Sequence, residues 1–402
     1  MLRAESSNRV ANTAIEGLLE RNQECLGEEF VRERIHRKVV MVTGAAGSIG
    51  SELCRQIARF GPLALIGFDQ AETQLFRLDS DLSERLPGLL FHSKIGNVAR
   101  FDDVSRTIDQ YRPSIVFHAA AYKHVPMLEK RMFAAVENNI FGTWNVAQAA
   151  ASHGVESFVL ISSDKAVCPS SMMGATKRVA ELAIRALGKQ RRTKFVAVRF
   201  GNVLGSSGSV VPIFKSQIAT GGPVTVTHPD MRRYFMTASE AGQLVLQALV
   251  LGKGGEIFVL DMGEPLSIVA LARSLILLSG LHPGRDIEIV FTGVRPGEKL
   301  VEELHKPDEQ LIPTARSRIY NLQSSDDVDA TQFTAFLEDL KMAVGERDAL
   351  GTIHLLKEMV PDYIPSPQLI EHAMSLQKIH GIADDIQDSS TESIERMLVT
   401  SK

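Results

Sequence analysis

Short apolar runs alternate with amphipathic stretches along the first half of the chain. The runs occupy residues 39–42, 63–68, 115–117, 158–161 and 196–198. Each has the length of a buried strand, and helical spacing of apolar side chains follows several of them. Alternating buried strands and helices are typical of an α/β fold with a parallel sheet. We therefore expect a Rossmann-like, doubly wound parallel sheet.

Helical patterns without strands lie at both ends of the chain. Ile15, Leu18, Leu19, Leu26 and Phe30 recur at helical spacing, which predicts a helical extension over residues 1–36. Further helices are predicted at 333–344, 354–359 and 369–380, followed by a polar tail. We expect residues 326–402 to form a C-terminal helical extension that caps the body or contacts another subunit.

Composition narrows the classes of protein. The chain has 402 residues, 44% of them hydrophobic, and a net charge of -4, so nothing favours nucleic acid as a partner. Its three cysteines are too few and too scattered for a disulfide framework, which fits a reducing compartment. No apolar run approaches the roughly 18 residues that a membrane span needs. We expect a cytoplasmic protein without a membrane span.

A glycine-rich turn follows the first apolar run. Gly44, Gly47 and Gly50 are spaced as in a dinucleotide-binding turn, and a helical pattern follows directly. Such glycines allow a tight turn and close approach of a pyrophosphate, which the helix N-terminus attracts. We expect these glycines, with Ser48 and Ile49, to bind a dinucleotide.

An acidic residue closes the second apolar run. Asp69 can accept hydrogen bonds from an adenosine ribose and would repel a 2′-phosphate, so NAD is favoured over NADP. Further along, Asn97 and Val98 either contact the adenine edge or form a plain turn.

The fourth apolar run leads into a loop of small residues. Ala119, Ala120 and Ala121 would let a flat cofactor lie against the backbone. The histidines on either side lack an acid or thiol at ligand spacing, so we expect no metal site. Asn138 and Asn139 are unfavourable inside a helix, and we expect them to brace neighbouring loops.

The stretch from Ser162 to Lys177 holds the candidate reaction centre. It lies where a buried strand ends and a helix begins, which is the edge at which doubly wound sheets bind ligands. Ser163, Asp164 and Lys165 bring a hydroxyl, an acid and an amine together there. Taken alone, the stretch also fits a polar connecting loop.

Several motifs, in order, resemble one family. They are Thr43-Gly-x-x-Gly-x-x-Gly50, His118-Ala-Ala-Ala-Tyr-Lys-His-Val-Pro126, Ser163-Asp-Lys-Ala166, Met173-Gly-Ala-Thr-Lys177, Arg199-Phe-Gly-Asn-Val-Leu-Gly-Ser206 and Arg233-Tyr-Phe-Met-Thr237. Together they resemble the extended short-chain dehydrogenase/reductase superfamily, and within it the polysaccharide-biosynthesis UDP-N-acetylglucosamine 4,6-dehydratases. The resemblance runs from about residue 37 to 325.

The resemblance implies a hydro-lyase that uses tightly bound NAD. Such enzymes convert UDP-N-acetylglucosamine to a UDP-4-keto-6-deoxy sugar for surface polysaccharide or glycan synthesis. By the same resemblance, Asp164 is the general acid at C6 and Lys165 the general base at C5. Ser163 is the hydrogen-bonding hydroxyl, and Lys177 binds the nicotinamide ribose.

One position departs from the superfamily. Met173 stands where a tyrosine is usual, four residues before Lys177, and a thioether cannot exchange a proton usefully. Larger, membrane-anchored members of the family resemble this chain in carrying methionine there. The step usually given to tyrosine then falls to Ser163, to Asp164 or to a water held by Lys177.

The substrate side follows the last strand. Asn202, in a Ser- and Gly-rich turn, is a candidate sugar or phosphate ligand, and Arg233 and Arg295 are candidates for the diphosphate. We also assign Lys123 and His124 to substrate binding. The division expected is an NAD-binding part over about 37–200 and a smaller substrate-binding subdomain mainly over 201–240 and 262–325.

The sequence leaves alternatives open. A dehydratase that inverts C5, a nucleotide-sugar epimerase of the same fold and a non-catalytic NAD-binding homologue all fit the motifs, although Lys165 argues against the epimerase. Superfamily members pair through helices that correspond here to about 131–152 and 174–188, so we expect a homo-oligomer. The chain also resembles the catalytic half of its larger relatives.

Overall fold

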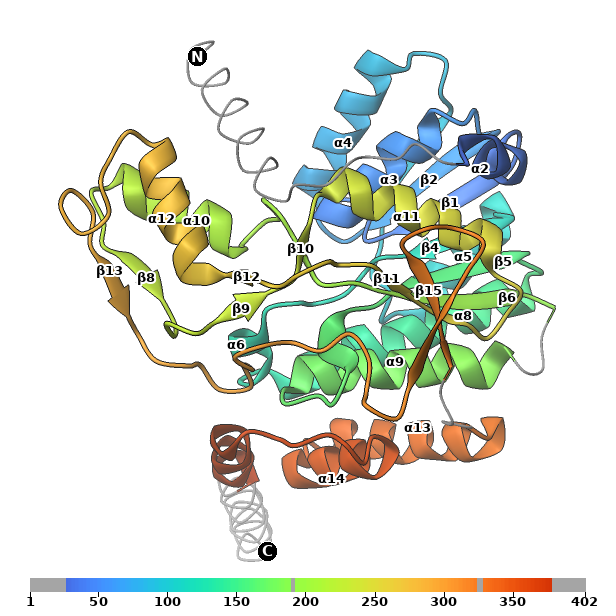
Figure 1. The fold of residues 1–402 in the computed structure, drawn as a ribbon. Helices are drawn as coiled ribbons and strands as arrows, with labels where there is room; N and C mark the ends of the chain where they lie inside the picture. Colours follow the sequence, from blue (N-terminus) through green and yellow to red (C-terminus); the bar gives the residue numbers. More distant parts are fainter. Residues whose placement is uncertain (1–26, 189–191, 324–327, 378–402) are drawn as a thin grey trace, which may run out of the picture.

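The computed structural model describes residues 27–188, 192–323 and 328–377. A large sheet is covered by helices on both faces, and a smaller lobe lies beside it (Figure 1). Most of the N-terminal extension and the polar C-terminal tail lie outside the described residues. The described chain begins with α2 (Glu28–Ile35).

The central sheet has the expected doubly wound order. Its strands are β1 (Val39–Thr43), β2 (Ala64–Asp69), β3 (Phe91–Ile95), β4 (Ile115–His118), β5 (Ser157–Ile161), β6 (Lys194–Arg199), β11 (Ile257–Leu260), β14 (Gln310–Pro313) and β15 (Ile319–Gln323). Their order is β14-β15-β11-β6-β5-β4-β1-β2-β3. The strands from β3 to β11 are parallel, whereas β15 and β14 add an antiparallel edge. The predicted fold class is confirmed.

Helices bury both faces of this sheet because its strands are apolar on both sides. One face is covered by α3 (Ser48–Ala58), α4 (Glu72–Arg85) and α11 (Ala238–Leu251). The other is covered by α5 (Phe101–Tyr111), α8 (Gly142–Ser152) and α9 (Met172–Gly188) (Figure 1). The carboxyl ends of the parallel strands therefore share one edge, where the sequence motifs lie.

The smaller lobe has its own apolar cluster. It contains α10 (Val210–Ala219), β8 (Val224–Val226), β9 (Arg232–Arg233), β12 (Leu266–Ser267), α12 (Ile268–Leu278) and β13 (Ile289–Phe291). Leu266 pairs with Arg233 in a short ladder, and α12 starts after Ser267. The short strands β7 (Asn202–Val203) and β10 (Phe235–Met236) join the lobe to the sheet.

The C-terminal helices α13 (Ala330–Gly345) and α14 (Ala349–Met359) pack along α9, on its side away from the sheet (Figure 1). Ala180 and Ile184 of α9 face the sheet cluster, whereas Val179 and Leu182 join the cluster formed with Phe333. Of the residues of α9, all but Arg185 and Gly188 are buried. A helix following α14 spans 367–377.

This packing bears on how subunits would pair. We expected residues 174–188 to contact a second subunit, but the chain's own α13 and α14 cover that helix. In this structure α9 therefore has little free surface for pairing with a second subunit. The homo-oligomer itself stays a prediction. Among the residues that the structure describes, no helix is both long and apolar enough to cross a bilayer.

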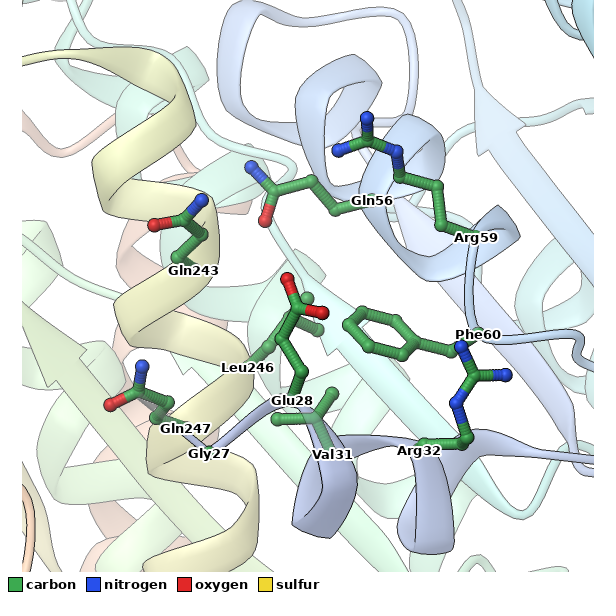
Figure 2. Close-up of a pocket in the computed structure, with 10 residues that line it drawn as sticks. All are labelled: Gly27, Glu28, Val31, Arg32, Gln56, Arg59, Phe60, Gln243, Leu246 and Gln247. Atoms are coloured by element: carbon green, nitrogen blue, oxygen red, sulfur yellow. The ribbon is translucent and has the colours of Figure 1, made fainter. Parts of the chain in front are cut away.

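A cavity of about 260 Å³ lies between α2, α3 and α11, on the sheet face opposite to α9. Figure 2 shows the side chains of Glu28, Gln56 and Phe60 directed toward one another across it. Its walls share no residue with the strand ends that carry the sequence motifs.

The C-terminal helices can be tested through Phe333, which is fully buried on α13. Its ring lies 5.6 Å from the ring of Trp144, the only tryptophan of the chain. Replacing Phe333 with Ala should lower the free energy of unfolding by about 3–5 kcal/mol, because a large buried ring leaves a cavity. Guanidinium unfolding followed by Trp144 fluorescence measures this loss.

Met342→Ala is the matched control, since Met342 lies on the same helix with 59% of its surface exposed. We expect its effect to stay within about 0.5 kcal/mol. Equal stabilities of the Phe333 variant and the unmodified chain would contradict the packing described here.

Candidate active site

The central acid and amine lie on one tight turn at the end of β5. Asp164–Ala166 form a single turn of 3-10 helix, and Ser163 caps it by accepting a hydrogen bond from the backbone N–H of Lys165 at 3.4 Å. The Ser163 hydroxyl donates to Asp164 Oδ1 at 2.7 Å. The sequence-predicted trio is thus joined by its own hydrogen bonds.

Lys165 connects this turn to the start of the smaller lobe. Its Nζ donates to Asp164 Oδ1 and to Asn202 Oδ1, each at 3.0 Å. The Asp164 side chain is fully buried, and its Oδ2 has no hydrogen-bond partner among the described residues. A buried carboxylate oxygen without a donor is costly unless something else binds it, so Oδ2 is a candidate acceptor for a ligand hydroxyl.

Two further charges complete the group around Lys165. The Glu302 carboxylate is 5% exposed and lies 3.8 Å from Lys165 Nζ and 3.8 Å from the Arg233 guanidinium. Burial alone would lower the pKa of Lys165, but the charges of Asp164 and Glu302 outweigh it and raise that pKa. Lys165 is therefore an ammonium ion in the resting protein.

Sequence reasoning missed Glu302. It follows the Arg-Pro-Gly-Glu-Lys run that contains Arg295, and its neighbour Glu303 is also a glutamate, so only the three-dimensional structure distinguishes the buried residue from the exposed one. Arg233 was assigned to the substrate diphosphate. Its guanidinium donates to the carbonyl oxygens of Arg232 and Leu300, which places it beside Lys165.

Lys177 and Met173 lie one turn apart on α9. Lys177 Nζ donates to the carbonyl oxygen of Ile161 at 2.8 Å, and burial lowers the pKa of this amine to about 8. Met173 is only 3% exposed and packs in the apolar cluster with Val125 and Val136. The methionine therefore replaces a proton-exchanging group with core packing.

The glycine-rich turn is shaped by close backbone approaches. Gly44 has a φ of 67°, and a Cβ there would lie 2.5 Å from the backbone nitrogen of Ala120. A Cβ on Gly50 would lie 2.0 Å from the Gly44 carbonyl oxygen. No side chain fits at either position, and α3 starts at Ser48 with its first N–H groups at this turn. This cradle fits the pyrophosphate of a dinucleotide.

The Asp69 carboxylate lies beside that turn. Its Oδ2 accepts from the backbone N–H of Ala46 and its Oδ1 from that of Ala71, each at 2.9 Å. These bonds fix the carboxylate and leave lone pairs for a ribose hydroxyl. Asn97 Oδ1 accepts from the Ala99 N–H, while Val98 is buried against the sheet, so their adenine contact stays a prediction.

Of the other residues in the predicted turn, Ser48 reaches toward the substrate side. Its Oγ accepts a hydrogen bond from the backbone N–H of Ser207 at 3.1 Å, whereas Ile49 packs against the core. The glycine-rich turn and the loop that follows β7 are therefore in direct contact.

Asn139 braces the alanine loop. It lies in η1 (Val136–Phe141), a π-helical segment that the sequence did not predict. Its Oδ1 accepts from the Tyr122 N–H, and its Nδ2 donates to the Tyr122 carbonyl and to Thr176 Oγ1. The loop 119–124 is thus tied to α9 beside Lys177, as expected for this asparagine. Asn138 donates to the same Oδ1.

His118 is locked inside the sheet. Its ring nitrogens lie 2.7 Å from Thr43 Oγ1 and 3.0 Å from Thr143 Oγ1. Burial, with the positive charge of Lys177, lowers the pKa of His118 to about 3, so the ring is neutral. Within the described ranges no three His, Cys, Asp or Glu side chains gather as a metal site would require.

Lys123, His124 and Arg295 are exposed side chains near one another. The pKa of His124 is lowered by burial and by the charges of Lys123 and Arg295, which places these three groups within electrostatic reach of one another. The guanidinium of Arg295 also pairs with Glu298 at 2.5 Å. The positive charges of Lys123 and Arg295 in this region suit an anionic diphosphate.

The C-terminal extension contacts the segment between the 3-10 turn η2 (Asp164–Ala166) and α9. Glu129, 4% exposed, accepts from the backbone N–H of Met172 at 2.7 Å and from the Ser366 hydroxyl at 2.6 Å. The Ile364 N–H donates to the carbonyl oxygen of Pro169 at 3.0 Å. Residues about 200 positions later in the chain thus fix the start of α9.

A buried ion pair joins the ends of β5 and β6 to α9. Glu181 on α9 accepts from the Ser162 hydroxyl at 2.6 Å and from the Arg199 guanidinium at 2.9 and 2.8 Å. Arg178 adds a third cationic contact at 2.8 Å. Burial alone would raise the pKa of Glu181, but these partners outweigh it and hold that pKa at about 2.

Comparison with known proteins places these motifs in a family. Residues 40–324, more than half of the chain, match the family model described as "Polysaccharide biosynthesis protein". The probable polysaccharide biosynthesis protein EpsC of Bacillus subtilis is 53% identical over 77% of this chain and 52% of its own length. The capsular polysaccharide biosynthesis protein CapD of Staphylococcus aureus is 47% identical over 83% and 56%. The chain spans about half the length of these two relatives.

Other similar proteins bear different names. A UDP-glucose 4-epimerase of Rickettsia rickettsii is 34% identical over 68% of this chain and 79% of its own. Among solved structures, Pen from Bacillus thuringiensis has a TM-score of 0.68 and 32% identity, covering 76% of this chain and 98% of its own. The dTDP-glucose 4,6-dehydratase DesIV of Streptomyces venezuelae, solved with NAD, shares the fold at a TM-score of 0.59 and 21% identity, over 66% and 88%.

The Glu181 ion pair predicts an acid-sensitive stability. Because the folded pKa lies below the ordinary value of 4.5, the stabilisation is complete above that value and is lost as pH falls toward 2. Glu181→Gln should cost about 3–5 kcal/mol at pH 7, since it leaves the buried Arg199 with only the more distant carboxylate of Glu309, 3.6 Å away. Urea unfolding at several pH values measures both effects.

The two proteins should converge in stability as the pH is lowered through this window. Glu84→Gln, on the exposed face of α4, is the control and should change stability by less than about 0.5 kcal/mol. A deficit of Glu181→Gln that stays constant down to pH 2 would disprove the electrostatic origin.

Proposed function

The chain belongs to the polysaccharide biosynthesis family of extended short-chain dehydrogenases/reductases, and on that basis we propose that it is a nucleotide-sugar 4,6-dehydratase. Its proposed substrate is UDP-N-acetylglucosamine, its product the UDP-4-keto-6-deoxy sugar and its cofactor NAD. The observation that carries the proposal is the fully buried Asp164 carboxylate at the carboxyl end of β5, which accepts a hydrogen bond from Lys165 Nζ.

The elimination needs an acid and a base on one sugar ring. Asp164 would protonate the departing C6 hydroxyl, and Lys165 would remove the C5 proton after losing its own. Their side chains share one turn, so both reach a ring lying over it. Asp164 Oδ2, which has no partner among the described residues, is the oxygen available to a sugar hydroxyl.

The cofactor would be held by residues already described. Gly44, Gly50 and the start of α3 would receive the pyrophosphate, Asp69 the adenosine ribose and Lys177 the nicotinamide ribose. When bound, NAD supplies an acceptor for the C4 hydride and returns it at C6. The pKa of Lys177, about 8, is close to neutral pH. Its amine can hold a water or a ribose hydroxyl by a hydrogen bond.

Met173 cannot take the proton of the C4 hydroxyl, because its thioether is buried in the apolar cluster. Ser163 and Asp164 instead offer oxygen atoms on the turn after β5. The 2.7 Å hydrogen bond between the Ser163 hydroxyl and Asp164 Oδ1 gives the C4 hydroxyl proton a path to the carboxylate. Asp164 would then carry the proton that it later gives to the C6 hydroxyl.

A nucleotide-sugar epimerase is the second candidate. It is favoured by the relative named UDP-glucose 4-epimerase, which matches two thirds of this chain. An epimerase returns the hydride to C4 and needs no acid and base pair for loss of water. The buried Asp164–Lys165 pair therefore favours the dehydratase, whether C5 is retained or inverted.

The first test is incubation with UDP-N-acetylglucosamine. A dehydratase gives a product lighter by about 18 mass units, an epimerase an isobaric product and a non-catalytic homologue no product. Lys165→Ala should reduce elimination by on the order of 10³-fold, because a general base contributes that much, while NAD stays bound. Mass spectrometry of the sugar nucleotide measures turnover.

Lys253→Ala, at an exposed position after α11, is the matched control and should keep full turnover. If Lys165→Ala eliminated water at the original rate, Lys165 would not be the base.

The second test concerns Asp69. Asp69→Ala should weaken NAD binding by about tenfold or more, since charged hydrogen bonds of this kind contribute about 1.5–3 kcal/mol. It should also reduce the preference for NAD over NADP, because the carboxylate that repels a 2′-phosphate is gone. Calorimetric titration of both cofactors measures the two affinities.

Asp339→Ala, exposed on α13, removes a carboxylate away from the turn and should leave both affinities unchanged. An Asp69 variant with wild-type affinity and wild-type cofactor preference would remove Asp69 from the ribose site.

A further inference from the structure

Three charged side chains surround the proposed base Lys165, and Glu302 among them has no role in the chemistry described above. Asp164 and Glu302 are the anions, and Lys165 and Arg233 the cations, so the group is neutral as a whole. A neutral Lys165 beside two carboxylates would leave a net negative charge in a site shielded from water. Removing the lysine proton therefore requires a nearby group that accepts it.

Asp164 Oδ1 is the nearest acceptor of that proton, but the mechanism proposed above already uses Asp164 to carry the C4 proton. Its Oδ1 already accepts from Ser163 Oγ at 2.7 Å and from Lys165 Nζ at 3.0 Å. Its other oxygen is the one assigned to the hydroxyl groups of the sugar. If Asp164 stored the lysine proton, it could not also receive the C4 proton that it later gives to C6.

Glu302 meets the requirement by geometry. Its carboxylate lies 3.8 Å from Lys165 Nζ, beyond a hydrogen bond but within reach of one bridging water or a small rotation of the lysine chain. The Arg233 guanidinium lies at the same distance from the same carboxylate oxygen, so neither cation forms a close hydrogen bond with Glu302. Burial, together with the charge of Asp164, raises the pKa of Glu302 despite the cations Lys165, Arg233 and Lys299.

The backbone around Glu302 is held on both sides. The Leu300 carbonyl accepts from the Arg232 N–H at 2.9 Å and from the Arg233 guanidinium at 3.0 Å. The Leu304 carbonyl accepts from Arg199, whose guanidinium also binds Glu181. The segment that carries Glu302 belongs to no helix or strand. Its hydrogen bonds to β9 and to the end of β6 nevertheless fix the position of the carboxylate.

We propose that Glu302 is a positioning residue that makes Lys165 usable as a base, by taking up the proton that the ammonium gives up when the sugar binds. An N–H bond of Lys165 breaks, an O–H bond forms on Glu302, and no electron donor or acceptor is involved. The net charge of the four-residue group is unchanged by this transfer. The proposal rests on the dehydratase function and adds a residue to it.

The first test compares Glu302→Gln with Glu302→Asp. The amide cannot take up a proton, so kcat at pH 7 should fall by on the order of 10²-fold with KM changed less than about twofold. The deficit should shrink as pH rises, because Lys165 can then lose its proton to solvent. The aspartate retains a carboxylate and should keep kcat within about tenfold of the original.

Glu303→Gln is the matched control, because Glu303 is the adjacent exposed carboxylate and pairs with Lys299. It should keep both kcat and its pH profile. A Glu302→Gln variant with the original kcat and profile would overturn the proposal. So would equal losses in the amide and aspartate variants at every pH, since a purely structural role gives that result.

A second measurement needs no turnover. In protein labelled at the lysine ε-carbon, the Lys165 resonance is identified by its absence in Lys165→Ala. We expect this ammonium to stay protonated to the alkaline end of the accessible range in the original protein. In Glu302→Gln it should titrate at least about one pH unit lower, because one of the two flanking negative charges is gone.

The two measurements separate the two proposals. If the original protein does not turn over UDP-N-acetylglucosamine but the Lys165 titration moves in Glu302→Gln, the dehydratase assignment fails and the coupling of Glu302 to Lys165 stands. If elimination is observed but the titration does not move, the dehydratase stands and the role of Glu302 is refuted.

Discussion

The bidentate pairing of Glu181 with Arg199 is the interaction on which the site depends. It joins α9 to the end of β6, and the Ser162 hydroxyl adds the end of β5 on the same carboxylate. The proposed acid and base begin two residues after Ser162, and Lys177 lies one turn before Glu181 on α9. A single buried carboxylate therefore sets the relative position of the turn that carries Asp164 and the helix that carries Lys177.

The parts of the site that sequence could predict are those encoded locally. The glycine spacing around Gly44 and Gly50, the acid at the end of β2 and the polar turn after β5 each combine a short motif with the strand or helix beside it. A Cβ on Gly50 would clash with the carbonyl oxygen of Gly44 only six residues earlier, so this steric demand is local and the short motif reveals it. The doubly wound sheet was predictable for the same reason.

What sequence could not predict depends on contacts between distant segments. Glu302 reaches Lys165 across more than a hundred residues, and Glu129 reaches Ser366 across more than two hundred. Nothing in the residues around Glu302 distinguishes it from Glu303. The π-helical turn around Asn139 and the antiparallel edge of β14 and β15 were likewise missed, because hydrogen bonding to other elements decides both.

The contacts of the C-terminal helices bear on how this protein changes through evolution. The family model ends at residue 324, yet Phe333, Ile364 and Ser366 lie further along and touch α8, Pro169 and Glu129. Substitutions in this C-terminal region therefore change the contacts that hold the start of α9, although they lie away from the reacting atoms. We expect residues of the C-terminal helices and of the segment 168–172 to be selected together. Exchanging one of these segments between homologues should then give a stable protein only when the other is exchanged as well.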